Sequence, residues 1–173
     1  MGADGRAELA EVMSRAPRRP PWPGPGRLAE LLREEADTLV REAGLSPAGL
    51  ALLLAARAAV ALEVARSVDW AASPPDVLGV EVAGRVVVVG RAVSFVADRV
   101  DALGEGVRLT DYKTGRSHST NKTADARERD LRREVAAGRR LQAAAYALAV
   151  ADRPAEGRYV YLRPDEEPEH RVA

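Results

Sequence analysis

The sequence predicts an α/β fold with a mixed central β-sheet flanked by helices. The first observation is a change at residue 77 from alanine- and leucine-rich segments to short valine-rich runs. The second is a return to a helical pattern after residue 124, followed by one more short apolar run. The predicted order of the core is therefore helix, three to four strands, helix, strand.

Two helices are predicted before the strands. Residues 27–42 carry leucine and valine at helical spacing, and Gly44 is expected to end this helix. Ser46 and Pro47 are suited to the cap and first turn of a second helix that runs to about Val68. This second helix is alanine- and leucine-rich nearly all round, so we expect it to be buried.

The second half of the chain predicts the sheet. Four valine-rich runs are typical of strands: residues 77–82, 85–89, 93–100 and 107–113. Glycine-containing segments are expected to form the turns of an antiparallel meander: Ala83-Gly84, Gly90 and Gly104-Glu105-Gly106. The remaining elements are, in order, a polar loop at 116–124, a long helix at about 125–151 and a strand at 157–162.

A chain of 173 residues is long enough to bury the core of one domain. The segment 18–26 is rich in proline, glycine and arginine and cannot sustain a helix or strand. We therefore expect a flexible N-terminal segment at 1–26 and a domain at 27–173, with a helical lead-in at 27–72 and the core at 77–163.

Composition excludes several classes of protein. The sequence contains no cysteine, so disulfides, thiolate zinc sites and an iron–sulfur cluster are excluded. The formal net charge is zero, so any contact with nucleic acid must come from a local patch. The N-terminus lacks the apolar core of a secretory signal, and the most apolar stretch, residues 50–62, is too short to span a bilayer. We expect a cytoplasmic protein that does not interact with membranes.

The most informative residues lie on two neighbouring predicted strands. Side chains alternate along a strand, so Asp111 and Lys113 project from one face and Tyr112 from the other. Asp98 lies near the end of the preceding strand. Two carboxylates that can hold a hard cation, beside an ammonium that can steer water, are typical of metal-assisted attack on a phosphodiester.

The choice of lysine at position 113 is itself informative. Only two of the 26 basic residues, Lys113 and Lys122, are lysine. A lysine ammonium is compact and its pKa can change beside a metal or in a dry pocket, whereas arginine stays protonated. A chemical role explains the exception, although chance would place two lysines somewhere too.

These residues resemble the PD-(D/E)XK nuclease superfamily, in particular its RecB-like exonuclease branch, the C-terminal nuclease domain of helicase–nucleases. Asp98-Arg99-Val100-Asp101 matches the element G-x-x-D-R-x-D, with Phe95 in place of the glycine. Asp111-Tyr112-Lys113-Thr114-Gly115 matches D-Y-K-T/S-G, and Gln142 with Tyr146 matches Q-x-x-x-Y on the next helix. Glu81 falls on the strand where the branch has its early acid. The resemblance covers about residues 77–162.

The resemblance implies a restriction-endonuclease-like core and a metal-dependent DNA nuclease in recombination or repair, with DNA and a helicase subunit as partners. It implies a Mg²⁺ or Mn²⁺ site with these ligands: Asp98, Asp111, the backbone carbonyl of Tyr112, and Glu81. Lys113 would orient the attacking water, and Gln142 and Tyr146 would support the site or the substrate strand.

Several alternatives stay open for single residues. Asp111 with Lys113 also fits an exposed ion pair on an edge strand, and Asp98 fits a salt bridge to Arg99. Glu81 fits equally well an acid on the solvent side. Asp101 is better suited to start the turn before Gly104 than to bind metal.

The loop and helix at 116–140 hold eight basic and four acidic residues. Arg116 and Lys122, in the loop beside the expected metal, are the best candidates for DNA contacts, while i,i+4 ion pairs account for much of the helix. Trp22 and Trp70 fit a linker anchor and a helix-end core residue better than base-stacking residues.

Two departures from the branch favour an alternative function. Its relatives often have a metal-binding histidine on an N-terminal helix, but the only histidines are His118 and His170. Glu30, Glu34 and Glu35 are possible replacements, and the pattern selects none of them. The alternative is a catalytically inactive nuclease-fold module, or a truncated remnant, that binds DNA or a helicase partner. A serine β-lactamase, suggested by Lys113-Thr114-Gly115, is excluded because its other elements are missing or out of order.

Overall fold

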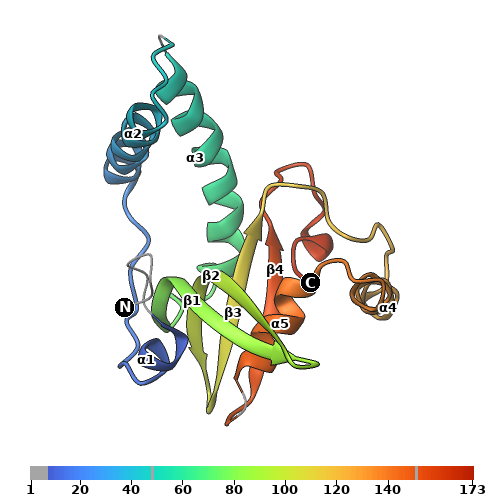
Figure 1. Cartoon of the computed structure of the whole chain (residues 1–173). Coiled ribbons are helices and arrows are strands. Elements are labelled where there is room, and N and C mark those ends of the chain that lie inside the picture. Colours follow the sequence, from blue (N-terminus) through green and yellow to red (C-terminus); the bar gives the residue numbers. More distant parts are fainter. Residues whose placement is uncertain (1–7, 48, 151) are drawn as a thin grey trace.

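The computed structural model describes residues 8–47, 49–150 and 152–173. Figure 1 shows one twisted sheet with helices around it. The elements are, in chain order, α1 (Leu9–Met13), α2 (Pro25–Glu42), α3 (Leu50–Asp69), β1 (Val77–Val88), β2 (Arg91–Leu103), β3 (Gly106–Lys113), α4 (Ala124–Ala136), α5 (Leu141–Ala149), β4 (Ala155–Tyr161) and a short 3₁₀ helix, Pro168–His170.

The four strands form one mixed sheet in the order β1-β2-β3-β4. β1 and β2 are antiparallel, as are β2 and β3, whereas β3 and β4 are parallel because α4 and α5 form the crossover between them. The predicted fold class, a mixed sheet flanked by helices with a restriction-endonuclease-like core, is confirmed. Helix α5 packs on one face of the sheet, and the C-terminal end of α3 reaches the other.

The main hydrophobic core lies between the sheet and α5. It joins valines of β1, β2 and β3 to three residues of the crossover, Ala145, Tyr146 and Val150. Gly157 of β4 allows this close approach, because a Cβ atom there would lie 2.0 Å from the carbonyl oxygen of Ala143. The glycine therefore brings the N-terminal end of α5 directly onto β4, next to the end of β3.

The expected turn at Ala83-Gly84 is wrong, because β1 is continuous from Val77 to Val88. Gly84 lies opposite Phe95 of β2, and a Cβ atom at residue 84 would lie 2.3 Å from the Phe95 ring. The glycine thus makes room for an aromatic ring across the strand pair. The Phe95 ring, which replaces the glycine of the G-x-x-D-R-x-D element, also packs on Tyr146 with centroids 4.9 Å apart.

The expected single helix at 125–151 is also wrong, because the chain forms two helices, α4 and α5. Gly138 has φ +76, and the amide N–H groups of Gly138 and Arg139 bond the carbonyls of Val135 and Glu134. This is a Schellman motif, which ends α4 and turns the chain. Arg140, with φ +52, then precedes α5.

Helices α2 and α3 form an antiparallel pair that projects from the sheet (Figure 1). The expectation that the second helix is buried is wrong for most of its length: the side chains of Leu52 and Leu53 are 63% and 58% exposed. Its buried residues are Ala55 in the N-terminal half and Val64 and Ala65 in the C-terminal part. The predicted cap at Ser46 is also wrong, because α3 begins after Gly49, which has φ +80.

Several described residues of the N-terminal segment contact the rest of the domain, and the flexibility expected for residues 1–26 stays a prediction. Among its described residues, Leu9 and Val12 of α1 are buried in the main core. Further along, Arg18 exchanges backbone hydrogen bonds with Val77 at the start of β1. Trp22 packs edge-on against Trp70 with centroids 5.0 Å apart, so the proline-rich stretch is anchored at the end of α3. The boundary at residue 26 itself stays a prediction.

Within the described part of the chain, no helix combines the length and the apolar character that a bilayer crossing requires.

Candidate active site on strands β2 and β3

The three predicted acids lie in one row across the sheet. Arg99 of β2 pairs with Thr110 of β3, so the next position along places Asp98 opposite Asp111. Val80 pairs with Arg99 and Val82 with Ala97, which places Glu81 of β1 opposite Asp98. Side chains in one row of a sheet share a face, so the fold aligns Asp98 with Asp111. Glu81 is in the same row, but its left-handed backbone, with φ +49, interrupts the alternation of β1.

Asp98 and Asp111 are fixed differently. Asp98 is half-buried, and its Oδ2 accepts a hydrogen bond from the backbone N–H of Tyr112 at 2.6 Å. Asp111 is only 4% exposed. The Asp98 carboxylate therefore bridges β2 to β3 at the residue that follows Asp111.

Lys113 lies on the same face as Asp111, as strand alternation predicts. Its Nζ is 2.6 Å from Asp111 Oδ2 and donates a hydrogen bond to Gln142 Oε1 at 2.7 Å. Nζ also lies 5.5 Å from the ring centroid of Tyr159 on β4. A flexible lysine side chain is thus held by a strand neighbour, a helix and an aromatic ring.

The two α5 residues of the Q-x-x-x-Y element both face the site. While Gln142 binds Lys113, Tyr146 donates from its hydroxyl to the carbonyl of Val96 at 2.9 Å and to Asp111 Oδ1 at 3.3 Å. Burial, and then the negative charges of Asp111 and Asp98, raise the pKa of the Tyr146 phenol well above its usual value. The hydroxyl therefore stays protonated and acts as a donor.

The electrostatics of this face favour a cation. Burial raises the pKa of Asp98; the Tyr112 N–H lowers it, and the neighbouring charges of Asp111 and Glu81 raise it further. Asp111 Oδ2 is buried and, despite the nearby ammonium, receives no well-aligned hydrogen bond from any described residue. Two carboxylates, those of Asp98 and Asp111, beside one lysine leave an excess of negative charge here.

A comparison with protein families identifies the fold family. The model of the PD-(D/E)XK nuclease superfamily matches residues 9–173. The chain belongs to this superfamily. No curated protein and no solved structure matches the chain. Members of the superfamily generally use divalent metal ions.

The residues present fit such a metal only in part. The carboxylates of Asp98 and Asp111 carry the hard oxygen atoms that such ions prefer, and the buried Asp111 Oδ2 receives no hydrogen bond from a described residue. Glu81 has a left-handed backbone with φ +49 and an exposed side chain. Among residues 8–47, 49–150 and 152–173, no three His, Cys, Asp or Glu side chains gather closely enough to hold an ion together. Two carboxylates, a backbone carbonyl and water are the ligand set that this arrangement offers.

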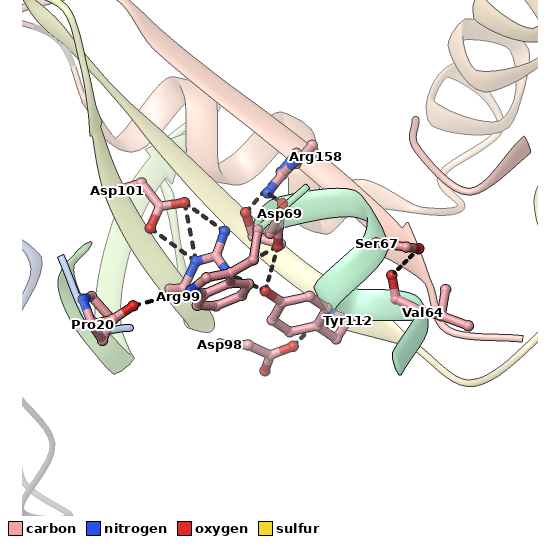
Figure 2. Close-up of polar contacts among 11 residues, drawn as sticks. Pro20, Val64, Ser67, Asp69, Asp98, Arg99, Asp101, Tyr112 and Arg158 are labelled. Carbon is pink, nitrogen blue, oxygen red and sulfur yellow. Dashed lines mark hydrogen bonds and ion pairs between the residues drawn. The ribbon is translucent and has the colours of Figure 1, made fainter. Parts of the chain in front are cut away.

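The opposite face of the same strands carries a second, buried charge cluster, shown in Figure 2. Arg99 lies 2.9 Å from Asp69 at the end of α3 and donates to both oxygens of Asp101, with Nη2 2.8 Å from Oδ2. Arg158 of β4 lies 2.5 Å from Asp69 and donates to the Thr110 hydroxyl at 2.9 Å. We call the residues Asp69, Arg99, Asp101, Tyr112 and Arg158 the back-face cluster.

Tyr112 connects the two faces. Its backbone N–H is bound by Asp98 on the site face, and its hydroxyl donates to Asp69 Oδ2 at 2.7 Å on the other. Arg99 also donates to this hydroxyl. The residue between Asp111 and Lys113 is therefore held from both sides, which fixes the directions of its neighbours.

Sequence reasoning missed most of this cluster. Alternation along β2 could have placed Arg99 and Asp101 together on the face opposite Asp98. Instead Asp101, expected to start a turn, is buried and bound by Arg99. No local signal identifies Asp69, which lies 43 residues before Tyr112.

Tyr159 was also missed. It pairs in register with Asp111, and its hydroxyl donates to the Arg140 carbonyl at 2.7 Å and accepts the Ala143 N–H at 3.2 Å. The hydroxyl thus caps the first turn of α5, which has no side-chain cap of its own. This contact fixes the end of α5 that carries Gln142.

The loop that follows β3 runs out to α4, which stands apart from the sheet in Figure 1. Ser119 and Asn121 bond Asp130 of α4 at 2.5 and 2.7 Å, and Ser117 bonds Glu166 near the C-terminus at 2.6 Å. Arg116, three residues after Lys113, and Lys122, next to the first turn of α4, are both exposed. Their role as DNA contacts stays a prediction.

Proposed function

We propose that this chain is a Mg²⁺- or Mn²⁺-dependent deoxyribonuclease of the RecB-like exonuclease type, acting in DNA recombination or repair with a helicase subunit. The observation that carries the proposal is the arrangement of Asp98 opposite Asp111, with the Lys113 ammonium held between Asp111 and Gln142. The order of the three motifs along β2, β3 and α5 supports the RecB-like assignment.

In this proposal Asp98 and Asp111 hold the metal with the carbonyl of Tyr112, and Glu81 assists from the neighbouring strand. When bound, the ion supplies a Lewis acid that polarises the phosphoryl oxygen and lowers the pKa of water. Lys113 orients the attacking water and stabilises the charge that develops on the phosphate. The water gives up a proton to solvent and its oxygen forms the new bond to phosphorus, while the bond to the leaving sugar oxygen breaks and that oxygen takes up a proton from solvent.

Gln142 and Tyr146 act through the groups they touch. The Gln142 amide oxygen accepts a hydrogen bond from Lys113 and so holds the ammonium in one position. The protonated Tyr146 hydroxyl donates to Asp111 Oδ1 and orients that carboxylate. Arg116 and Lys122 would contact the phosphates of the bound strand.

The test has two readouts. Purified protein should degrade linear DNA with Mg²⁺ or Mn²⁺, stop when a chelator is added, and lose activity in Asp111→Ala and Lys113→Ala without unfolding. Titration calorimetry should detect Mn²⁺ binding to wild type and a loss of binding in Asp98→Ala. Glu105→Ala, in the exposed β2–β3 turn, is the matched control for both. Equal turnover in wild type and Asp111→Ala would show that the site is assigned wrongly.

One observation favours a second candidate, the inactive module that binds DNA or a helicase. The exposed position of Glu81 and the lack of three gathered ligands within the described residues are features of a site that has lost a ligand. The same experiments separate the two candidates: an inactive module binds DNA equally well in wild type and Asp98→Ala, and neither takes up Mn²⁺.

A further inference from the structure

Arg140 is a cation beside the site that the proposed mechanism does not use. It lies in the linker between α4 and α5, two residues before Gln142. Its Nη1 donates to the Tyr161 hydroxyl at 3.2 Å, and the guanidinium carbon is 6.0 Å from the centroid of that ring. Tyr161 pairs in register with Lys113, so Arg140 is held at the β4 position next to the lysine.

Two cations thus lie over two neighbouring tyrosines of β4. Lys113 lies over Tyr159 and Arg140 over Tyr161, and the two ring centroids are 6.4 Å apart. Both tyrosines are almost completely buried, so they form a rigid floor. The floor keeps both positive charges on the face that carries the carboxylates.

The charge of Arg140 is not balanced by an acid. The buried arginines of the opposite face, Arg99 and Arg158, each form ion pairs, whereas Arg140 forms none with a described residue. Glu134 lies close enough for Arg139 and then Arg140 to lower its pKa, but Arg139 already bonds both of its oxygens at 2.8 Å. A half-buried guanidinium with one neutral partner keeps several N–H donors available for an anion.

The backbone at this position adds an independent argument. Arg140 has φ +52, in the left-handed region that favours glycine. A residue other than glycine whose backbone has this unfavourable conformation is typical of functional positions, where the surrounding structure holds it in place. Here the Tyr159 hydroxyl, bonded to the Arg140 carbonyl, holds the backbone.

We propose that Arg140 binds a phosphate of the DNA strand next to the phosphate that is cleaved. This inference rests on the proposed nuclease function and names a residue that holds its substrate. The planar guanidinium of arginine can donate two parallel hydrogen bonds to the oxygens of one phosphate. Because Arg140 lies next to Lys113, a phosphate bound there would lie beside the carboxylates.

The first measurement is DNA affinity by fluorescence anisotropy at several salt concentrations, in chelator so that no strand is cut. Arg140→Gln should weaken binding of a single-stranded oligonucleotide roughly 10-fold, the effect of losing one charge-assisted contact. The slope of log affinity against log salt should fall by about 0.7, the value for one phosphate contact on a single strand. Arg129→Gln, on the exposed surface of α4, is the matched control.

The second measurement separates binding from folding. Arg140→Gly suits the left-handed backbone, so its Tm should stay close to that of wild type while its DNA affinity falls as in Arg140→Gln. Mn²⁺ titration should give the same affinity in both variants as in wild type. A purely structural Arg140 would lower Tm in both variants and leave the salt slope unchanged.

The outcomes distinguish the two proposals. Wild-type affinity and salt slope in both Arg140 variants would overturn the role of Arg140 and leave the nuclease function standing. A wild type that neither binds Mn²⁺ nor cuts DNA, but whose DNA affinity still depends on Arg140, would overturn the nuclease function and support the phosphate site. A wild type that binds no DNA would overturn both.

Discussion

The two faces of strands β2 and β3 carry similar residues in opposite electrostatic states. The back-face cluster joins two arginines to two aspartates, all almost completely buried, so its charges are balanced. On the site face Asp98 and Asp111 lie beside one ammonium, that of Lys113, and Asp111 Oδ2 lacks a well-aligned donor among the described residues. A cluster whose charges are balanced stabilises one arrangement of the chain. A cluster with an excess of negative charge is suited to bind a positively charged ligand.

The largest expected effect is on the balanced face. Asp69→Ala removes the acid shared by Arg99, Arg158 and Tyr112, and it should destabilise the protein by about 3 to 5 kcal/mol, because the buried Arg158 loses its acid partner and Arg99 loses one of two. Urea unfolding measures this change. Asp76→Ala is the control: Asp76 bonds Arg19 at 2.6 Å on the surface and should have little effect. Equal losses in the two variants would contradict the contrast between buried and exposed pairs.

On the site face, removing a charged group should lower the rate of the reaction and leave the stability of the fold nearly unchanged. Lys113→Met keeps the length of the side chain and removes its charge, so DNA cleavage should fall about 100- to 1000-fold while Tm changes little. Initial rates on a labelled linear duplex measure this. Lys122→Met, the same substitution at the other lysine, is the control, and it should lower the rate only through DNA affinity. A large fall in Tm for Lys113→Met would place Lys113 with the structural residues.

The third prediction is that removing a carboxylate charge changes the stability of the protein in opposite directions on the two faces. Asp98→Asn removes one of three like charges and should stabilise the metal-free protein, by up to about 1 kcal/mol, because burial and the Asp111 and Glu81 charges disfavour ionised Asp98. Mn²⁺ should raise the Tm of wild type and not of this variant. Asp69→Asn, on the balanced face, should destabilise, because the partners of Asp69 outweigh its burial and hold the pKa of this carboxyl below its usual value. A loss of stability in Asp98→Asn would show that its bond to Tyr112 outweighs the repulsion.

The smallest expected effect is on pH dependence. Burial alone would raise the pKa of Asp69, but Arg99, Arg158 and the Tyr112 hydroxyl outweigh it and hold this pKa below its usual value. The contribution of Asp69 to stability is therefore complete above the ordinary aspartate pKa of about 3.9 and is lost as the pH falls through the lower, folded pKa. Unfolding free energies between pH 6 and pH 3 should fall more steeply in wild type than in Asp69→Asn. Parallel curves would contradict the lowered pKa.

Much of the fold could be predicted because its signals are local. Valine-rich runs identified the sheet, Gly44 and Gly90 marked a helix end and a hairpin, and the alternation of Asp111, Tyr112 and Lys113 was correct. The errors came from tertiary contacts: Gly84 was interpreted as a turn, although it makes room for Phe95. The apolar α3 was expected to be buried, although only α2 and the end of the sheet cover it. Gly138 was a visible signal for the helix break, and it was overlooked.

The candidate site was predictable to the extent that its residues fall in motifs. Asp98, Asp111, Lys113, Gln142 and Tyr146 were all named from the sequence, and the fold joins them by direct contacts. The residues that hold them were not found, because Asp69 and Tyr159 come from distant segments and act through register and hydroxyl groups. The position of Arg140 beside the site could not be inferred, because the sequence predicts one unbroken helix there.

The hydrogen bond between Tyr112 and Asp69 connects the projecting pair of helices, α2 and α3, directly to the sheet. Asp69 is the last residue of α3, and its carboxylate accepts a hydrogen bond from Tyr112, which stands between Asp111 and Lys113. A tilt of the 20-residue α3 must therefore either release the phenol or pull β3 with it. Force applied to the tip of this arm, away from the site, would be transmitted to the spacing between the Asp111 carboxylate and the Lys113 ammonium.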